Sequence, residues 1–231
     1  MGLGEWFDPA AREYGRMARA HGKLWQWGLA HLKLFAPLDI ADLGCGDGRV
    51  LAELLRMFPQ AKVTGLDSSP EAVQLARKRN HGDITSRRCE IVEGSVAALP
   101  FADETLDLVT AFETIYFWPG PLESFREVYR ALMPGGLFMI VNKLDGEAQA
   151  PPAWAEQIDG LTAYDKMTLI RLLKEAGFDE FSVDQNEAQL WLCIIRAKMN
   201  NFSQCIRTKS GAFCIFIEKI CNESLTRALI R

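Results

Sequence analysis

Apolar residues in this chain form short continuous runs that alternate with segments of helical spacing. Strands are predicted over 39–43, 61–67, 88–94, 106–112 and 137–144, and the segment 106–112 is nearly continuous in apolar character, as expected of a central parallel strand. In the other segments apolar residues recur every three or four positions, over 49–58, 71–80, 122–132 and 164–176. Strands that alternate with amphipathic helices predict an α/β fold with a mostly parallel sheet.

The pattern changes at both ends of this region. Two strand-like segments, 178–185 and 189–198, lie close together in the sequence and can pair as a hairpin, with the last strand inserted antiparallel. Near the start, Asp8 and Pro9 are typical of a helix N-terminus, and helices are predicted over 10–20 and 22–35. These helices carry too much apolar surface for a free tail, so we expect them to pack on the domain as a lid.

A glycine-rich turn, DLGCGDG at 42–48, connects the first predicted strand to a helix. A strand, glycine turn and helix in this order present backbone N–H groups and a helix N-terminus to a nucleotide-like ligand. The dinucleotide fingerprint requires a further glycine where Arg49 stands. The carboxylates of Asp42 and Asp47 would repel a pyrophosphate and attract an ammonium or sulfonium group. The turn therefore favours S-adenosylmethionine over NAD.

A second carboxylate site lies at the end of the second predicted strand. Asp67 follows the glycine turn by about 20 residues, the spacing at which an acidic residue meets the ribose in nucleotide-binding α/β folds. A carboxylate there can accept hydrogen bonds from both ribose hydroxyls. The alternative is that Asp67 only caps the next helix, but Ser68, Ser69 and Pro70 already supply caps.

These motifs resemble those of the class I S-adenosylmethionine-dependent methyltransferases, in a small-molecule group of that family. The resemblance covers about 10–198 and includes Leu-Pro-Phe at 99–101 and Met-Pro-Gly-Gly at 133–136. It implies a Rossmann-like, doubly wound sheet of seven mostly parallel strands in the order 3-2-1-4-5-7-6, with helices on both faces. It divides the chain into an N-terminal helical lid at 1–35, a methyltransferase domain at 36–198 and a C-terminal extension of unassigned role at 199–231.

The resemblance also implies the cofactor, S-adenosyl-L-methionine, and its product, S-adenosyl-L-homocysteine. We expect Asp42 to face the methionine amino group through water, Asp67 to hold the ribose, and Ser95 with Val96 to border the adenine. Many relatives have an aspartate where Ser95 stands, and serine can accept only a weaker, uncharged hydrogen bond. The full expected set of cofactor-binding residues is Asp42, Gly44, Cys45, Gly46, Gly48, Asp67, Ser68, Ser95, Val96 and Phe112.

The end of the fourth predicted strand is expected to border the methyl acceptor. Glu113 and Tyr116 are the candidate catalytic residues there. In-line methyl transfer depends mainly on orientation, and a general base is needed only for a weakly acidic hydroxyl or a protonated amine. Glu113 or a lid histidine, His21 or His31, could serve as that base. We expect a small-molecule acceptor.

Composition narrows the remaining alternatives. The net charge of −4 argues against general nucleic-acid binding, and no apolar stretch resembles a signal peptide or a membrane span. The six cysteines fit no metal-ligand spacing, so we expect free thiols and no bound metal. Together with the lack of a signal peptide or membrane span, this predicts a cytoplasmic protein without membrane contact. We expect a monomer or a homodimer.

Other functions stay open on the sequence alone. The first alternative is a catalytically silent S-adenosylmethionine-binding protein. An NAD(P)-dependent oxidoreductase is disfavoured by Asp42 and Arg49 and by the lack of a Tyr-x-x-x-Lys pair. A nucleic-acid or protein methylase is also conceivable, but the Asn/Asp-Pro-Pro-aromatic motif of amino-methylating nucleic-acid enzymes does not follow the fourth strand; residues 113–116 read ETIY.

Overall fold

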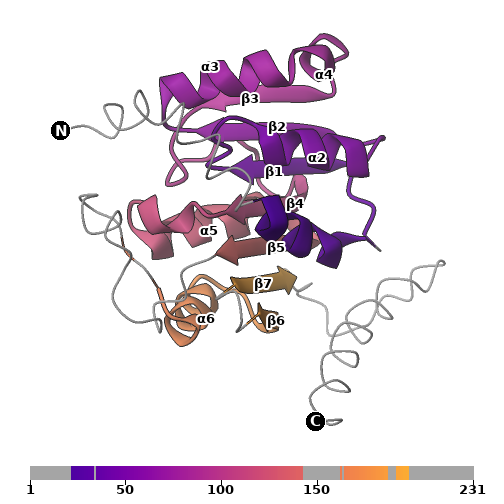
Figure 1. The fold of residues 1–231 in the computed structure, drawn as a ribbon. Helices are drawn as coiled ribbons and strands as arrows, with labels where there is room; N and C mark the ends of the chain where they lie inside the picture. Colours follow the sequence, from indigo (N-terminus) through magenta and orange to yellow (C-terminus); the bar gives the residue numbers. More distant parts are fainter. Residues whose placement is uncertain (1–21, 34, 143–161, 163, 187–190, 198–231) are drawn as a thin grey trace, which may run out of the picture.

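Seven strands form a single sheet in the computed structural model, which describes residues 22–33, 35–142, 162, 164–186 and 191–197. Their order across the sheet is β3-β2-β1-β4-β5-β7-β6 (Figure 1). Strands β1 to β5 pair in parallel, whereas β7 is antiparallel to both β5 and β6. This arrangement confirms the predicted fold class and strand order. The strand bounds are β1 (Asp39–Leu43), β2 (Lys62–Asp67), β3 (Cys89–Glu93), β4 (Leu106–Phe112), β5 (Leu132–Asn142), β6 (Glu180–Asn186) and β7 (Trp191–Ala197).

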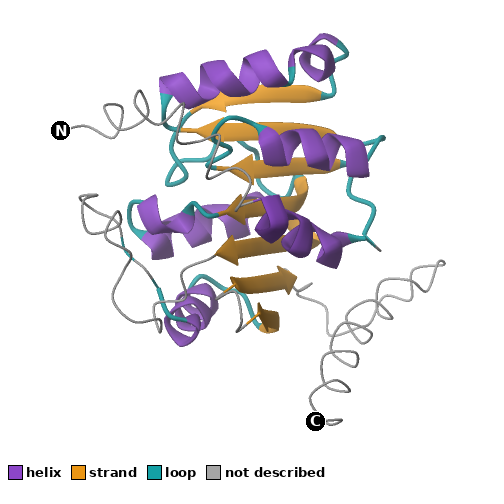
Figure 2. Ribbon diagram, in the orientation of Figure 1, coloured by secondary structure: helices purple, strands orange, loops and turns teal. Residues whose placement is uncertain are grey.

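Helices connect the strands and cover both faces of the sheet. In Figure 2, α3 and α4 lie beside β3 at one edge, and α6 lies near β6 at the other. None of the helices in the described ranges is long and apolar enough to cross a lipid bilayer. The helices are α2 (Arg49–Met57), α3 (Pro70–Arg79), α4 (His81–Thr85), α5 (Pro121–Ala131) and α6 (Lys166–Glu175), with short 3-10 turns η2 (Ala30–Leu32) and η3 (Ile115–Phe117) and a further helix over 22–29.

Two apolar clusters divide the core, one on each face of the sheet. Side chains alternate along a strand, and so β5 sends Met139 and Val141 into one cluster and Phe138 and Ile140 into the other. The first cluster packs the sheet against α2, α3 and the helical segment 22–32, and the second packs it against α5 and α6. The predicted packing of the segment before β1 on the domain is therefore confirmed for its described residues.

Some element bounds differ from the sequence prediction. Strand β5 begins at Leu132, directly after α5, although Pro134, Gly135 and Gly136 were expected to separate the two elements. The left-handed φ of 86° at Gly135 and a register shift between Leu106 and Leu108 let this irregular backbone join the sheet.

Further differences concern short or peripheral elements. Helix α4 was not predicted, because five residues are too few to show helical periodicity. The helix expected over 22–35 changes to the 3-10 turn η2. Cys45, Cys89 and Cys193 are free and buried, as expected of those three. The predicted helix at 10–20, His21, the other three cysteines and the extension at 199–231 lie outside the described residues.

Candidate cofactor and acceptor site

The glycine turn lies between β1 and α2, at the carboxyl end of the central strands. The backbone N–H groups of Gly44 and Cys45 both donate to the Leu66 carbonyl, at 2.7 and 3.1 Å, which fastens the turn to β2. Gly44, Gly46 and Gly48 have left-handed φ values of 71°, 53° and 77°. Residues with a Cβ pay an energetic cost in this conformation, so the turn requires glycine for its shape.

The three glycines differ in their surroundings. A Cβ on Gly44 would overlap the Thr114 hydroxyl, and one on Gly48 would overlap the side-chain amide of Asn80. A Cβ on Gly46 would meet no atom within 4 Å. Gly44 and Gly48 therefore permit close packing within the protein, whereas Gly46 borders open space that a ligand can enter.

Asp67 connects the glycine turn to the start of α3. Its two carboxylate oxygens accept hydrogen bonds from the backbone N–H groups of Gly46, at 2.8 Å, and Ser69, at 2.9 Å. Ser69 is the N-cap of α3 and accepts from the N–H of Ala72, so Asp67 is not the cap. Each carboxylate oxygen has a second lone pair, and the position of Asp67 beside the turn suits the predicted ribose contact.

Burial dominates the electrostatics of Asp42, the penultimate residue of β1, and of Asp67, the last residue of β2. Asp42 is buried, and burial raises its pKa to about 7, although the Thr110 hydroxyl donates to its Oδ1 at 2.6 Å and opposes the shift. Burial also raises the pKa of Asp67, against the effect of the backbone N–H groups that it accepts. A cationic ligand group would stabilise the ionised form of either carboxylate.

The other acid of the turn is neutralised within the protein. Asp47 forms ion pairs with Arg49, at 2.8 Å, and with Arg79, at 2.9 Å. The expectation that Asp47 offers uncompensated negative charge to a ligand is therefore wrong. Sequence spacing did not reveal the pair with Arg79, because Arg79 lies 32 positions away at the end of α3.

Cys45 and Phe112 contribute to the core more than to the surface of the turn. Both side chains are buried in the first apolar cluster. A Cβ on Gly65 would lie 2.9 Å from the Cys45 sulfur, so this thiol packs on β2 and only the Cys45 backbone belongs to the turn. A Cβ on Gly28 would lie 3.0 Å from Phe112, so the helix at 22–29 covers the end of β4 at close range.

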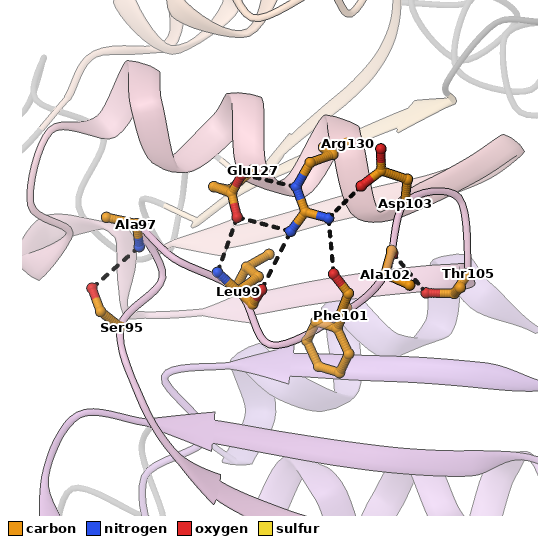
Figure 3. A network of polar contacts seen from close by, with 9 residues as sticks. All are labelled: Ser95, Ala97, Leu99, Phe101, Ala102, Asp103, Thr105, Glu127 and Arg130. Atoms are coloured by element: carbon orange, nitrogen blue, oxygen red, sulfur yellow. Dashed lines mark hydrogen bonds and ion pairs between the residues drawn. The ribbon is translucent and has the colours of Figure 1, made fainter.

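Near the predicted adenine contacts, the chain after β3 is held by an arginine of α5 (Figure 3). The Arg130 guanidinium donates to the Phe101 carbonyl and to Asp103 at 2.8 and 2.7 Å, and Glu127 accepts from Arg130 and from the Leu99 N–H. No pattern in the sequence indicated this network. It holds the backbone of Leu99 and Phe101, in the loop that follows the predicted adenine residues Ser95 and Val96.

The two predicted adenine residues differ in how far they are buried. Val96 is buried in the second apolar cluster. Ser95 is exposed, and its hydroxyl accepts from the Ala97 N–H at 3.2 Å (Figure 3). Ser68, which follows Asp67, is also exposed. The exposed side chains of Ser68 and Ser95 follow the carboxyl ends of adjacent strands, β2 and β3.

Glu113 and Tyr116 are brought together directly after β4. The buried Tyr116 hydroxyl donates to Glu113 Oε1 at 3.0 Å. Glu113 has a left-handed φ of 58°, which is uncommon for a residue other than glycine and occurs often at functional sites. Its backbone N–H donates to the Val141 carbonyl at 2.8 Å, so the turn stays attached to β5. The two candidate catalytic residues therefore form one hydrogen-bonded unit.

His31 is engaged elsewhere and is not suited to act as a general base. Its Nε2 lies 2.9 Å from Asp184 Oδ2 on β6, and its Nδ1 lies 3.0 Å from the carbonyls of Trp27 and Gly28. Because oxygen acceptors face both ring nitrogens, the doubly protonated ring suits this position best. Burial acts to lower the pKa of His31, but the hydrogen bonds to Asp184 and the Gly28 carbonyl outweigh it and raise the pKa.

The His31–Asp184 pair predicts a stability that depends on pH. The folded-state pKa of His31 is above the unfolded value, so its contribution is full below the unfolded pKa and is lost as pH rises through the folded pKa. The difference in urea midpoint between the parent protein and His31→Gln should therefore be larger at about pH 6 than at about pH 9. An equal difference at both values would show that His31 is neutral in the folded protein.

The fold is an α/β sheet with a glycine turn and two acidic residues, Asp42 and Asp67, at the carboxyl ends of β1 and β2. Residues 41–140 match the family model described as methyltransferase domain. Cycloartenol-C-24-methyltransferase of Arabidopsis thaliana is 30% identical over 77% of this chain, and erythromycin 3''-O-methyltransferase of Saccharopolyspora erythraea is 28% identical over 67% of it. A Haloferax volcanii methyltransferase, solved in complex with the Trm112 activator, has a TM-score of 0.74 and 21% identity, over 88% of this chain and 100% of that one.

The chain carries a methyltransferase domain of the class I S-adenosylmethionine-dependent family. The matches span 56% of the length of each of the two curated relatives named above. Within the described ranges, no group of three or more His, Cys, Asp or Glu side chains is placed to hold a metal ion.

Proposed function

We propose that this protein transfers a methyl group from S-adenosylmethionine to a small-molecule acceptor. The observation that carries the proposal is the connection between Asp67 and the glycine turn, at 2.8 Å from the Gly46 N–H, beside the open space at Gly46. This arrangement places a carboxylate with spare lone pairs next to a backbone that a ligand can approach closely. When bound, the cofactor supplies an activated methyl group on a sulfonium whose sulfur departs with the bonding electrons.

The chain's own residues would hold and orient the cofactor. Asp67 would accept from the ribose hydroxyls, and Asp42 would stabilise the methionine ammonium. The exposed Ser95 and the adjacent Val96 would border the adenine. The helix at 22–29, which packs on Phe112, would act as part of a lid that limits water near the reacting groups.

The acceptor would lie at the Glu113–Tyr116 unit. The two relatives above are named for cycloartenol and erythromycin, and both are small molecules. Glu113 would take the proton of an acceptor that loses one on methylation, and Tyr116 would hold the Glu113 carboxylate in place through their 3.0 Å hydrogen bond.

Calorimetric titration of the full chain tests this function most directly. We expect micromolar binding of S-adenosylmethionine and S-adenosylhomocysteine and no binding of NADH, which serves as the control ligand. Binding of NADH alone would favour the oxidoreductase alternative. Binding of both sulfur compounds, with no S-adenosylhomocysteine released from S-adenosylmethionine in the presence of a broad acceptor panel, would favour the catalytically silent protein.

Cofactor affinity should depend on pH through Asp42. The pKa of Asp42 is raised to about 7, so this carboxyl is mostly protonated below that value and ionised above it. Because the ionised form attracts the ammonium, affinity for S-adenosylmethionine should rise by roughly three- to tenfold between about pH 6 and about pH 8. Asp42→Asn should remove most of this rise. A rise of the same size in the variant would assign the titration to another group.

A further inference from the structure

Asn142, the last residue of β5, has a fully buried side chain. Its exposed fraction is 0%, and neither its amide nitrogen nor its amide oxygen has a hydrogen-bond partner within the part of the chain that the structure describes. Buried polar groups in proteins are almost always paired, because an unpaired one loses its hydrogen bonds to water without replacement. This amide therefore needs an explanation other than packing.

The backbone of Asn142 lies next to that of Glu113 at the end of the sheet. Phe112 pairs with Val141 in the parallel register of β4 and β5, and the Glu113 N–H donates to the Val141 carbonyl. Glu113 and Asn142 are the next residues along these neighbouring strands. Both therefore lie at the carboxyl end of the sheet, where ligands bind in open α/β folds.

We propose that the Asn142 amide binds the methyl acceptor and that the reacting group of this acceptor is a neutral hydroxyl. This inference rests on the function proposed above. A hydroxyl has one donor and two acceptor positions, so it can donate to the Glu113 carboxylate and accept from the Asn142 N–H. Asn142 thus acts as a positioning residue that selects the acceptor and fixes the direction of its oxygen.

Charged acceptors fit this pair of side chains less well. A carboxylate would be repelled by Glu113, since like charges at close range oppose each other. An ammonium only donates hydrogen bonds, so it could pair with Glu113 and the Asn142 amide oxygen but would leave the Asn142 N–H groups without an acceptor. The combination of one carboxylate and one neutral amide therefore favours an alcohol or phenol.

Nuclear magnetic resonance of the full chain, saturated with S-adenosylhomocysteine, tests the inference. Three probes share one ring and differ in charge: benzyl alcohol, benzoate and benzylammonium. The Asn142 side-chain amide signals are assigned by their loss in Asn142→Leu. We expect benzyl alcohol to shift these signals saturably, and to bind Asn142→Leu at least fivefold more weakly.

The outcomes separate this inference from the proposed function. If S-adenosylhomocysteine does not bind, the proposed function fails, and the inference fails with it. If it binds and the Asn142 signals do not move with benzyl alcohol, or move only with a charged probe, the inference alone is overturned.

A stability measurement separates acceptor binding from a structural role. Ser124 is a matched control, because it is also fully buried but its hydroxyl donates to the Pro119 carbonyl at 3.0 Å. Ser124→Ala should lower the midpoint of thermal unfolding. Asn142→Leu, which keeps the branching and the number of side-chain heavy atoms, should leave the midpoint unchanged or raise it and keep S-adenosylhomocysteine affinity within twofold. A clear loss of stability in Asn142→Leu would show that the amide supports the fold instead.

Discussion

Replacing Gly44 by alanine is expected to destabilise the protein by about 3 kcal/mol, from about 1–2 kcal/mol for a left-handed alanine and about 1–3 kcal/mol for overpacking. The Cβ would overlap the Thr114 hydroxyl at the end of β4. Gly46→Ala has the same backbone cost but meets no neighbour within 4 Å, so its loss should be about 1 kcal/mol. Urea unfolding of the parent protein and the two variants measures the difference in the free energy of unfolding.

Gly46→Ala, the variant with the smaller expected loss of stability, should show the larger loss of cofactor affinity. Gly46→Ala places a methyl group in the space that the cofactor would use, so its affinity for S-adenosylmethionine should fall at least tenfold while the fold persists. Adding Thr114→Ala to Gly44→Ala should recover the part of the stability loss that comes from overlap with the hydroxyl, which a double-mutant cycle measures, while the Cβ of residue 114, 2.7 Å from the added Cβ, still contributes to the loss. Equal stability losses in Gly44→Ala and Gly46→Ala would show that packing against Thr114 does not constrain the turn.

Asp67→Ala is expected to weaken S-adenosylmethionine binding at least tenfold. The change removes the acceptor for the N–H groups of Gly46 and Ser69, at 2.8 and 2.9 Å, together with the predicted ribose contact. Hydrogen bonds to a charged acceptor are worth about 1.5–3 kcal/mol each, and about 1.4 kcal/mol corresponds to a factor of ten. Asp67→Asn keeps one acceptor oxygen and should bind with intermediate affinity.

Asp47→Ala is the matched control for that titration. Asp47 belongs to the same turn, but its carboxylate pairs with Arg49 and Arg79. Its loss should change cofactor affinity by less than about threefold, because exposed or partly exposed ion pairs contribute little. An unchanged dissociation constant in Asp67→Ala would contradict the ribose contact and the role of this strand end.

The arrangement of the sheet could be predicted from the sequence, because its signals are local or belong to the family resemblance. Continuous apolar runs indicated the parallel strands, and two closely spaced strands at 178–198 indicated the antiparallel insertion. Glycine spacing likewise identified the turn, and all three of its glycines have left-handed backbones. Glu113 and Tyr116 are one helical turn apart in sequence, so their hydrogen bond was within reach of a spacing argument.

Contacts between distant residues could not be predicted in this way. His31 and Asp184 are 153 positions apart, and nothing near either residue in the sequence indicates the other. Asp47 could be read as a free carboxylate because Arg79 reaches it only after α3 has packed against α2. The burial of the Asn142 amide follows from the layers on both sides of β5, and a single asparagine at a strand end gives no sign of it.

The position of β7 has a consequence for how the chain folds during synthesis. Among the described strands, β7 is last in sequence but lies between β5 and β6, so β6 has no neighbour among them until β7 is synthesised. The parallel strands β1 to β5 can assemble while the polypeptide is still on the ribosome, whereas β5 remains an open edge. Unpaired edges promote association between nascent chains, and pairings that wait for late residues are slow to form. The interval between synthesis of β5 and of β7 is therefore the period in which this sheet is most exposed to misassembly and to capture by chaperones.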